Sequence, residues 1–337
     1  MKVGTLGFAT DQGLGVLIKS FYDNRVVDDV VVIRHGRRVT HTEWYPNSLV
    51  TGVISCAEVL EFCRSVDVML FFETPFDWSL ISSCREMGVK TVLMPMHECM
   101  PKTLPQQPDL ILAPSLLDQV CYPGCAYLPI PVDVSYKRRT HARTFVHNAG
   151  NLGLRGRNGT LELMQAMEYV VNPIELLIRS QTNEIHGLIR QTGIKQDRRV
   201  SIQVGTVPHN LLWDYGDVFV FPEKFNGLSL PIQESCAAGM LVMATDRFPN
   251  NQYLPTEPLI PTQGFNTVAI AGHLRTFEEA VIKPKDLAAH IDKWYETDIS
   301  PYSDYGLTYA KENTWEELGP RYRKLLEDLV NADTVRS

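Results

Sequence analysis

The chain has 337 residues, of which 44% are hydrophobic and 21% are charged, and its formal net charge at pH 7 is −7. This length predicts two domains rather than a single core. The acidic balance excludes a protein whose whole surface grips nucleic acid, although it leaves room for a local basic patch. No apolar run approaches the ~20 residues of a membrane span, and the N-terminal run is too short for a signal peptide, so we expect a cytoplasmic protein.

The cysteines indicate a reducing compartment. There are seven of them, scattered and odd in number: Cys56, Cys63, Cys84, Cys99, Cys121, Cys125 and Cys236. None forms the paired close spacing of a zinc site, because Cys121 and Cys125 have no second half. We therefore expect small buried hydrophobic side chains rather than disulfides or metal ligands.

The first part of the chain alternates short apolar runs with amphipathic helical patterns. Strands are expected at residues 2–9, 28–34, 52–55, 66–73, 90–96, 110–115 and 126–130, and helices at 15–24, 57–66 and 78–88. Strands that are apolar on both faces and alternate with helices indicate a parallel sheet covered on both sides.

A second series of the same kind follows Pro131. Strands are expected at residues 144–150, 173–180, 200–205 and 217–222, and helices at 159–170, 184–193 and 209–216. The joint between the two series is the segment 128–144, where prolines and a charge run interrupt both periodicities. The pattern predicts a second open α/β sheet.

Five segments, in the right order along the chain, resemble the GT-B fold retaining glycosyltransferases of the large sugar-nucleotide-dependent family (group 1, family 4-like). They are "LPIPVD" (128–133), "HNAGNLGLRGRNGTLELMQAM" (147–167), "VSIQVGTVPHNLLWDYGDVFVFP" (200–222), "NGLSLPIQESCAAGMLV" (226–242) and "YAKENTWEELGPRYRKLLEDL" (309–329). They resemble, in turn, the interdomain junction, the start of the donor domain, its next two strands, the signature in which seven residues separate two glutamates, and the closing helix.

The resemblance implies an α/β fold of two doubly wound Rossmann-like domains facing a cleft. The acceptor-side domain would span residues 1–133, the nucleotide-sugar-binding domain 134–308, and a C-terminal helix, 309–337, would return to the first domain. The implied activity is transfer of a sugar from a nucleotide-sugar donor, UDP- or GDP-type not distinguished, to an acceptor hydroxyl. The resemblance also implies retention of configuration, and no metal or separate cofactor.

The signature carries one departure from the family. Asn226 stands where the family has its first glutamate, which contacts the transferred sugar, while Glu234 stands at the second, which binds the ribose. Ribose binding by Glu234 is therefore expected to be kept, and Asn226 is the expected sugar contact. Glu223 is a second candidate carboxylate for the sugar, provided that its loop shifts. The alternative for Glu234 is a half-exposed helix glutamate on the solvent side.

The segment Gly227, Leu228 and Ser229 is expected to bind the donor pyrophosphate. It begins a helix, and a helix N-terminus offers free N–H groups and a partial positive charge. Arg157 is expected to neutralise the phosphates as a catalytic group, with its neighbour Arg155 as a second ligand, since a guanidinium can bind two oxygens at once. The alternatives are an ordinary βαβ crossover and solvated arginines in a glycine loop.

Two candidate sites fall in the first domain. Gly13 and Gly15 lie in "FATDQGLGV" (8–16), which resembles the family's first loop, where N–H groups approach the donor phosphates; the alternative is a plain βα turn capped by Asp11. His97 follows the strand at 90–96, at the carboxyl end where open α/β sheets bind ligands. The family often carries a histidine there, near the transferred sugar, and His97 is an expected catalytic residue.

Glu98 and Glu73 are expected to share the space around this histidine. The acceptor itself is left open among a glycan, a small molecule and a modified nucleic acid. The basic clusters at 34–38 and 137–143 are typical of solvated surface, and the alternative is an anionic acceptor or a peripheral contact with a membrane.

Two rival functions are considered, of which Asn226 motivates the first. One is a degenerate GT-B protein that binds a nucleotide sugar without transferring it, and the other is a sugar-nucleotide epimerase on the same architecture.

Overall fold

The structure is a computed structural model that describes residues 1–34, 41–46, 48–54, 56–152, 156–269 and 276–332. The chain forms two compact units. The N-terminal unit contains residues 1–131 together with the segment from Thr314 onward, and the C-terminal unit contains the described residues from Val132 to Asn313. The division expected from the sequence, after residues 133 and 308, falls close to these bounds.

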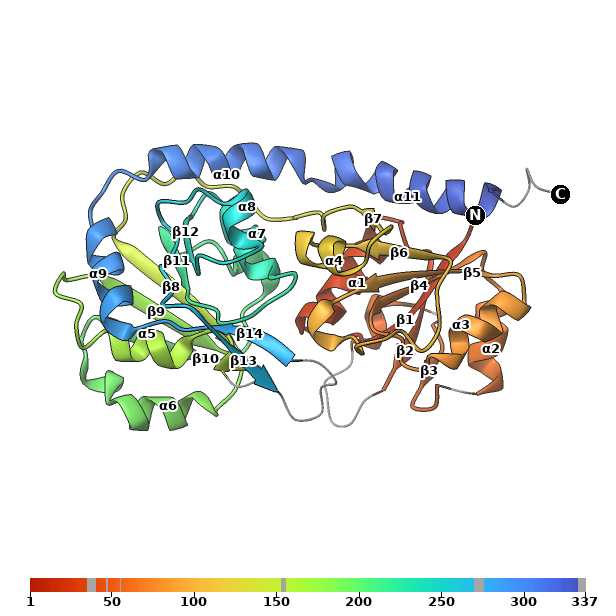
Figure 1. The fold of residues 1–337 in the computed structure, drawn as a ribbon, viewed down its shortest axis with the longest axis horizontal. Helices are drawn as coiled ribbons and strands as arrows, with labels where there is room; N and C mark the ends of the chain where they lie inside the picture. Colours follow the sequence, from red (N-terminus) through yellow and green to blue (C-terminus); the bar gives the residue numbers. More distant parts are fainter. Residues whose placement is uncertain (35–40, 47, 55, 153–155, 270–275, 333–337) are drawn as a thin grey trace. The chain divides into compact units, whose positions relative to one another are not determined.

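The N-terminal unit is built on a parallel sheet in the order β3-β2-β1-β4-β5-β6-β7 (Figure 1). Its strands are β1 (Val3–Gly7), β2 (Asp29–Ile33), β3 (Val50–Thr51), β4 (Val68–Glu73), β5 (Lys90–Pro95), β6 (Leu110–Ala113) and β7 (Ala126–Tyr127). Its helices are α1 (Gly13–Asp23), α2 (Ala57–Arg64), α3 (Ser79–Glu86), α4 (Leu116–Cys121) and α11 (Trp315–Asn331), with 3-10 turns η1 (Thr42–Trp44) and η2 (His97–Cys99). All five residues of β1 are buried, as a strand covered on both faces requires.

One strand of this sheet differs from the expectation. Residues 52–54 are not in a strand, and residue 55 lies outside the described residues. β3 lies two residues earlier, where Val50 and Thr51 pair with Val32 and Ile33 of β2. The chain then leaves the sheet, and Val53 is 60% exposed. A short edge strand of this kind limits unwanted pairing with other chains.

The C-terminal unit contains a parallel sheet in the order β10-β9-β8-β11-β12 and a separate antiparallel hairpin, β13–β14. Its strands are β8 (Thr144–Gly150), β9 (Glu175–Ser180), β10 (Val200–Val204), β11 (Val218–Phe221), β12 (Leu241–Ala244), β13 (Phe265–Ala269) and β14 (Thr276–Ala280). Its helices are α5 (Thr160–Ala166), α6 (Ile185–Thr192), α7 (Leu230–Ala237), α8 (Asn250–Tyr253), α9 (Pro284–Trp294) and α10 (Ser300–Glu312), with 3-10 turns η4 (Ile194–Gln196) and η5 (His209–Leu211). The helix expected at 209–216 is therefore only the single turn η5.

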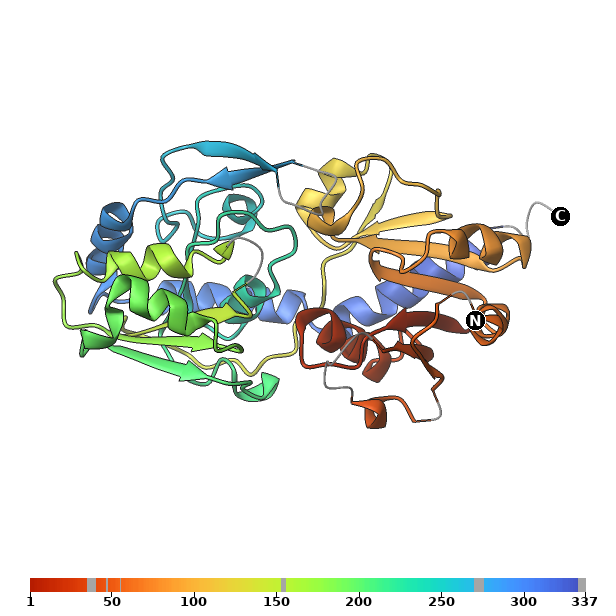
Figure 2. The same cartoon turned by 90° about the horizontal axis from the view of Figure 1, so that it is seen from below.

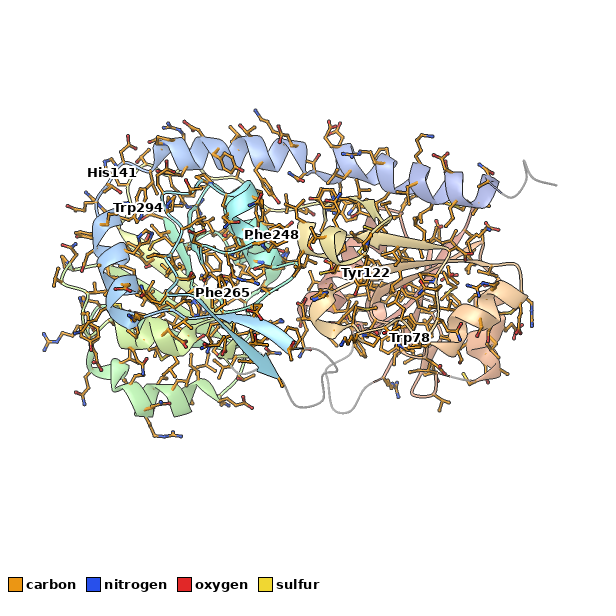
Figure 3. All side chains as sticks on the ribbon, in the orientation of Figure 1. Trp78, Tyr122, His141, Phe248, Phe265 and Trp294 are labelled. Carbon is orange, nitrogen blue, oxygen red and sulfur yellow. The ribbon has the colours of Figure 1, made fainter. Side chains whose placement is uncertain are left out.

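Helices cover both faces of this second sheet. α5 lies beside α6 and α9 over one face, as Figure 2 shows, and α7 and α10 pack together over the other. Trp294 of α9, labelled in Figure 3, packs its ring edge-on against Tyr302 of α10, with 5.2 Å between ring centroids. Apolar residues on both faces of β11 and β12 fill these two cores.

The stretch expected as one closing helix, 309–329, consists of parts of two helices. α10 ends at Glu312 and α11 begins at Trp315. Between them Thr314 acts as an N-cap, because its hydroxyl accepts a hydrogen bond from the Glu317 N–H at 3.2 Å.

An aromatic cluster packs α11 within the N-terminal unit. The rings of Trp315 and Tyr322 each meet Phe21 of α1 edge-on, at 5.0 Å between centroids. The Trp315 indole N–H donates to the Ser20 hydroxyl at 2.8 Å, and the buried Tyr322 hydroxyl donates to the Leu128 carbonyl at 3.0 Å. The two ends of the chain therefore contribute to one core.

Strand order reverses once in each sheet, between β1 and β4 and between β8 and β11. Open α/β sheets bind ligands at such a reversal, outside the carboxyl ends of the strands. The two parallel, helix-covered sheets confirm the expected fold class of two Rossmann-like domains. Within the described ranges, no helix is long and apolar enough to cross a membrane.

Candidate functional site

The reversal between β8 and β11 brings together two loops of the C-terminal unit. The loop after β8 carries Arg157, and the loop after β11 carries Asn226. The Lys224 N–H donates to the Arg157 carbonyl oxygen at 2.6 Å, so the two loops are joined through the main chain. Two expected donor-site residues thus come from the loops where this kind of sheet binds ligands. Arg155 lies outside the described residues.

Gly159 allows the loops to approach this closely. Its φ is +70°, and a Cβ added there would lie 1.9 Å from the Pro222 carbonyl oxygen. Only glycine fits both the backbone angle and the contact. The preceding Asn158 donates its side-chain N–H to the Ala149 carbonyl at 3.0 Å. The Asn-Gly pair beside Arg157 therefore has a structural reason that is independent of any ligand.

A shielded ion-pair network fixes the same loops to their surroundings. The Lys224 ammonium lies 3.0 Å from Glu162 of α5 and 3.5 Å from Glu279 of β14, and all three side chains are less than one-fifth exposed. Beside it, Phe225 stacks on Phe277 of β14 with 5.1 Å between ring centroids. The β13–β14 hairpin is therefore part of the scaffold of the β11–α7 loop.

At the start of α7, two main-chain N–H groups are already bonded within the protein. The Ser229 N–H donates to the Asn226 side-chain oxygen at 3.3 Å, and the Ile232 N–H donates back to the Ser229 carbonyl at 3.0 Å. Pro231 has no N–H to offer. Arg247 in turn donates to the Asn226 main-chain carbonyl at 3.0 Å. Asn226 therefore shapes the loop through its own bonds.

Ser229 adopts a left-handed backbone conformation with φ +47°, which is unusual for a residue that has a Cβ. Its hydroxyl does not cap α7 and has no hydrogen-bond partner in the described part of the chain, although the residue is only 6% exposed. The neighbouring Gly227 and Leu228 are also buried.

The carboxylate of Glu234 lies one turn into α7 and is held by two side chains. His209 Nε2 is 3.0 Å from Oε1, and the Trp213 indole N–H donates to Oε2 at 3.1 Å. The side chain is 13% exposed. A carboxylate has about four acceptor positions, so Glu234 retains acceptors for a diol while its orientation is fixed.

Sequence reasoning did not identify the partners of Glu234. His209 and Trp213 are four residues apart, a spacing that puts two side chains on one face of a helical turn, and this was the available signal. The hydrogen bond to Glu234 raises the pKa of His209 above its ordinary value. Behind them the buried Arg139 donates to the carbonyl oxygens of Trp213 at 2.7 Å and Gly216 at 2.6 Å.

Glu223, the second candidate for contacting the sugar, is engaged within the protein. It is fully buried, and its carboxylate accepts hydrogen bonds from the Asn250 side chain and from the Thr245 N–H, with Arg247 4.0 Å away. Burial raises the pKa of Glu223 to about 7. These bonds tie β11 to the segment after β12, so moving Glu223 toward a sugar would break them.

In the N-terminal unit, His97 opens η2 directly after β5. The main-chain N–H of His97 donates to Asp118 Oδ1 of α4 at 2.9 Å, and its ring Nε2 lies 3.9 Å from Cys121 Sγ. The imidazole ring also lies against Tyr122, labelled in Figure 3, with 6.5 Å between ring centroids. Burial raises the pKa of Asp118 to about 7. The position of His97 therefore depends on α4, a helix that the sequence did not predict.

Glu98 follows His97 in η2, and Glu73 contacts the residues on either side of this pair, Met96 and Cys99. Glu98 is buried in η2, and Glu73 ends β4 with φ +65° and accepts a hydrogen bond from Cys99 Sγ at 3.1 Å. The Met96 N–H also donates to the Glu73 carbonyl at 3.2 Å. A left-handed, non-glycine residue at a strand end marks local backbone strain.

Gly13 and Gly15 open α1 after β1. A Cβ at Gly15 would lie 2.2 Å from the Thr10 carbonyl oxygen, so close packing accounts for this glycine, whereas a Cβ at Gly13 would meet nothing within 4 Å. Asp11 does not cap α1, contrary to the alternative considered above. Instead it bonds His41 Nε2 at 2.9 Å and raises the pKa of His41.

The basic cluster at 137–143 is not a free cationic patch. Arg138 lies 3.0 Å from Asp304, Arg139 is buried, and Arg143 lies 3.5 Å from Glu296. The exposed pairs of Arg138 and Arg143 agree with the solvated-surface interpretation, whereas the buried Arg139 does not.

Of the other basic cluster, 34–38, only Arg34 is described.

All seven cysteines are free thiols, of which Cys63, Cys84 and Cys236 are buried and the others half-buried. Among the described residues, no group of three or more His, Cys, Asp or Glu side chains is placed to hold a metal ion.

No family model matches the sequence, and no curated protein matches it either. Solved structures do resemble it. HepE from Anabaena, solved with UDP and glucose, has a TM-score of 0.71 at 13% identity, covering 97% of this chain and 100% of its own. A glycosyltransferase from Rickettsia africae has a TM-score of 0.69 at 10% identity, covering 98% of both chains.

Sucrose-phosphate synthase from Thermosynechococcus elongatus has a TM-score of 0.65 at 13% identity, covering 98% of this chain and 100% of its own. At these identities the likeness concerns the fold, and it extends over nearly the whole length of each protein. Together with the two parallel sheets, it shows that this chain has the GT-B fold of glycosyltransferases.

Proposed function

We propose that the protein is a glycosyltransferase that moves a sugar from a nucleotide-sugar donor to an acceptor hydroxyl. The observation that carries this proposal is the Glu234 carboxylate, held by His209 and Trp213 one turn into α7. A fixed, mostly buried acceptor at the sheet reversal suits the paired hydroxyls of a ribose. HepE, which shares the fold, has been solved with UDP and with UDP-glucose, so uridine nucleotides are the first ligands to test.

The remaining roles follow from position. Arg157, on the loop joined to the β11–α7 loop, neutralises the pyrophosphate, and Asn226 faces the transferred sugar. His97 of the N-terminal unit positions or polarises a sugar hydroxyl. These roles agree with the placement of Arg157 and Asn226 at one sheet reversal and of His97 at a strand end.

We expect transfer with retention of configuration and without a metal ion. Glu223, the carboxylate nearest in sequence to the sugar position, is buried and bonded, which disfavours it as an enzymic nucleophile. The acceptor oxygen then bonds to the anomeric carbon while the carbon–phosphate oxygen bond breaks, and the acceptor proton passes to the leaving phosphate. Arg157 and the partial charge of the α7 N-terminus stabilise the developing negative charge.

Substitution of Glu234 tests the proposal. Glu234→Ala should weaken nucleotide binding by about 1.5–3 kcal/mol, as expected for loss of hydrogen bonds to a charged group. Calorimetry with UDP, GDP, ADP and CDP measures this loss, and Glu296→Ala, at a distant surface carboxylate, is the control. Unchanged affinity in Glu234→Ala would remove the ribose assignment. A strict requirement for a divalent cation after chelation would contradict the metal-free reaction.

A second candidate function is binding of a nucleotide sugar without transfer. It is favoured by Asn226, whose side-chain oxygen is already bonded to the Ser229 N–H. Asn226→Glu separates the two functions: a working transferase should lose rate or change its preferred sugar, whereas a binder should gain hydrolysis or transfer. Product analysis also tests the epimerase, since isomerised free nucleotide sugar would identify that activity.

A further inference from the structure

An amide and a guanidinium stand where the signature of the resembled family has a carboxylate. Asn226 takes the place of the first signature glutamate, and the Arg247 guanidinium donates to the Asn226 main-chain carbonyl at 3.0 Å. Both residues belong to the C-terminal unit. The position expected to meet the transferred sugar has therefore exchanged a negative charge for a neutral amide beside a positive charge.

The Ser229 N–H fixes the direction of the Asn226 amide. This N–H lies 3.3 Å from the Asn226 side-chain oxygen. Because an N–H can only donate, the atom that faces it must be the oxygen and not the nitrogen. The amide nitrogen therefore points away from the start of α7 and carries two N–H donors, whereas a glutamate at this position would offer only acceptors.

Arg247 keeps its positive charge throughout the neutral pH range, and its side chain is only 10% exposed. The Glu223 carboxylate lies 4.0 Å from it, beyond hydrogen-bond distance, and accepts bonds from the Asn250 side chain and the Thr245 N–H. Burial raises the pKa of Glu223 to about 7, so this carboxylate repels an anion less than a fully ionised one would. A guanidinium shielded from water attracts an anion more strongly than an exposed one does.

We infer that the transferred sugar is a uronic acid, whose carboxylate is bound by the Asn226 side-chain N–H groups and by Arg247. This inference rests on the proposed function; it names the class of sugar and adds Arg247 as a residue that sets the choice of donor. Carboxylate oxygens accept hydrogen bonds from an amide and, more strongly, from a guanidinium. A neutral hexose has a hydroxymethyl group in place of that carboxylate and gains no ionic attraction from Arg247.

Matched nucleotide sugars that differ only at C6 test the inference. UDP-glucuronic acid is compared with UDP-glucose, and UDP-galacturonic acid with UDP-galactose, by competition calorimetry against UDP. The wild type should bind the uronic acid of at least one pair roughly 10- to 100-fold more tightly, which is the effect of a hydrogen bond to a charged group. Where another nucleoside diphosphate binds better than UDP, the pair is built on that nucleotide, as in GDP-mannuronic acid and GDP-mannose.

Two substitutions assign the preference to these residues. Asn226→Asp keeps an acceptor for the Ser229 N–H but replaces the outward N–H groups with a negative charge. Arg247→Gln keeps a donor for the Asn226 carbonyl but removes the positive charge. Each should abolish the preference for the uronic acid and leave the affinity for the parent nucleoside diphosphate nearly unchanged. Arg138→Gln is the matched control, because it removes an exposed guanidinium that pairs with Asp304 in the same unit, and it should retain the preference.

The outcomes separate this inference from the proposed function. Equal affinity of the wild type for the uronic acid and the neutral sugar in every pair would overturn the inference and leave the proposed function standing. A preference that survives both substitutions would also overturn it, since the carboxylate would then be bound elsewhere. If Arg247→Gln does not fold, Asn226→Asp decides alone. If the wild type binds none of UDP, GDP, ADP or CDP, the proposed function fails and the inference fails with it.

Discussion

Single buried residues determine how closely the chain approaches itself around the β8–β11 reversal. Gly159 is packed on the Pro222 carbonyl, and His147 is fully buried between the Val220 carbonyl and the Thr160 hydroxyl, at 2.8 Å from each. Neither residue needs a ligand to account for it. They fix the positions of the two loops through contacts within the protein itself.

Gly159→Ala should destabilise the C-terminal unit strongly. The left-handed backbone costs a residue with a Cβ about 1–2 kcal/mol, and the 1.9 Å approach to Pro222 forces a further shift. We expect a loss of at least ~3 kcal/mol in the free energy of unfolding, measured by urea denaturation. Gly156→Ala is the control, since its φ is +63° but a Cβ there meets nothing within 4 Å. Equal losses in the two variants would show that the Pro222 contact does not matter.

His147 should make stability depend on pH. Burial lowers its pKa from 6.5 to about 4, so the unfolded chain takes up the proton more readily than the folded one. The contribution of neutral His147 to the free energy of unfolding is therefore fully present above pH 6.5. It is lost as the pH falls toward 4, at up to about 1.4 kcal/mol per pH unit.

The difference between the wild type and His147→Asn isolates this effect, because the carboxylates common to both proteins cancel. The free energy of unfolding, measured by urea denaturation, should fall more steeply between pH 7 and 5 for the wild type than for the variant. The extra slope near pH 5 should correspond to the uptake of about one proton on unfolding. Parallel curves for the two proteins would show that His147 does not titrate between the folded and unfolded states.

At the scale of elements, the β13–β14 hairpin supports the β11–α7 loop although it stands outside the main sheet. It reaches the β11–α7 loop through Phe277 and Glu279, and the Ala280 N–H donates to the Lys224 carbonyl at 2.8 Å. Phe265 of β13, labelled in Figure 3, remains 47% exposed. Val268 of β13 also packs against the Phe225–Phe277 cluster, so both strands of the hairpin contribute to this attachment.

Lys224→Met should loosen this attachment. The substitution leaves the carboxylates of Glu162 and Glu279 shielded from water and without the cation that now lies 3.0 and 3.5 Å from them. Removing one partner of a largely buried ion pair costs about 3 kcal/mol or more. Urea denaturation should show this loss, and nucleotide affinity should fall with it, while Lys224→Arg should retain most of both. Wild-type stability in Lys224→Met would assign the attachment to the aromatic stack alone.

At the scale of the whole molecule, the sequence predicts what local patterns control. The strand predicted at 144–150 has the same bounds as β8. A mostly buried run marks its course, and Gly150 marks its end. The hairpin β13–β14 was not predicted, since its strands are mostly exposed and lack a clear alternation. Likewise the bonds from His209 and Trp213 to Glu234 join segments over twenty residues apart, which no local pattern reports. Motif resemblance located Glu234; tertiary contacts supplied its partners.

The two units should behave differently when separated. The residues proposed to bind the nucleotide sugar from the C-terminal unit, Arg157, Asn226 and Glu234, lie in the segment 132–313, whose core is complete without the rest of the chain. The N-terminal unit instead needs α11, since Phe21 packs on Trp315 and Tyr322.

A fragment of residues 132–313 should therefore fold cooperatively and bind the preferred nucleoside diphosphate with nearly the affinity of the full chain. A fragment of residues 1–131 should remain unfolded or aggregate, because it exposes the apolar surface that α11 covers, and joining residues 314–332 to it through a flexible linker should restore folding. Circular dichroism and calorimetry on the three fragments test this. Cooperative folding of 1–131 alone would show that α11 is dispensable, and a folded 132–313 that binds no nucleotide would show that donor binding requires the N-terminal unit.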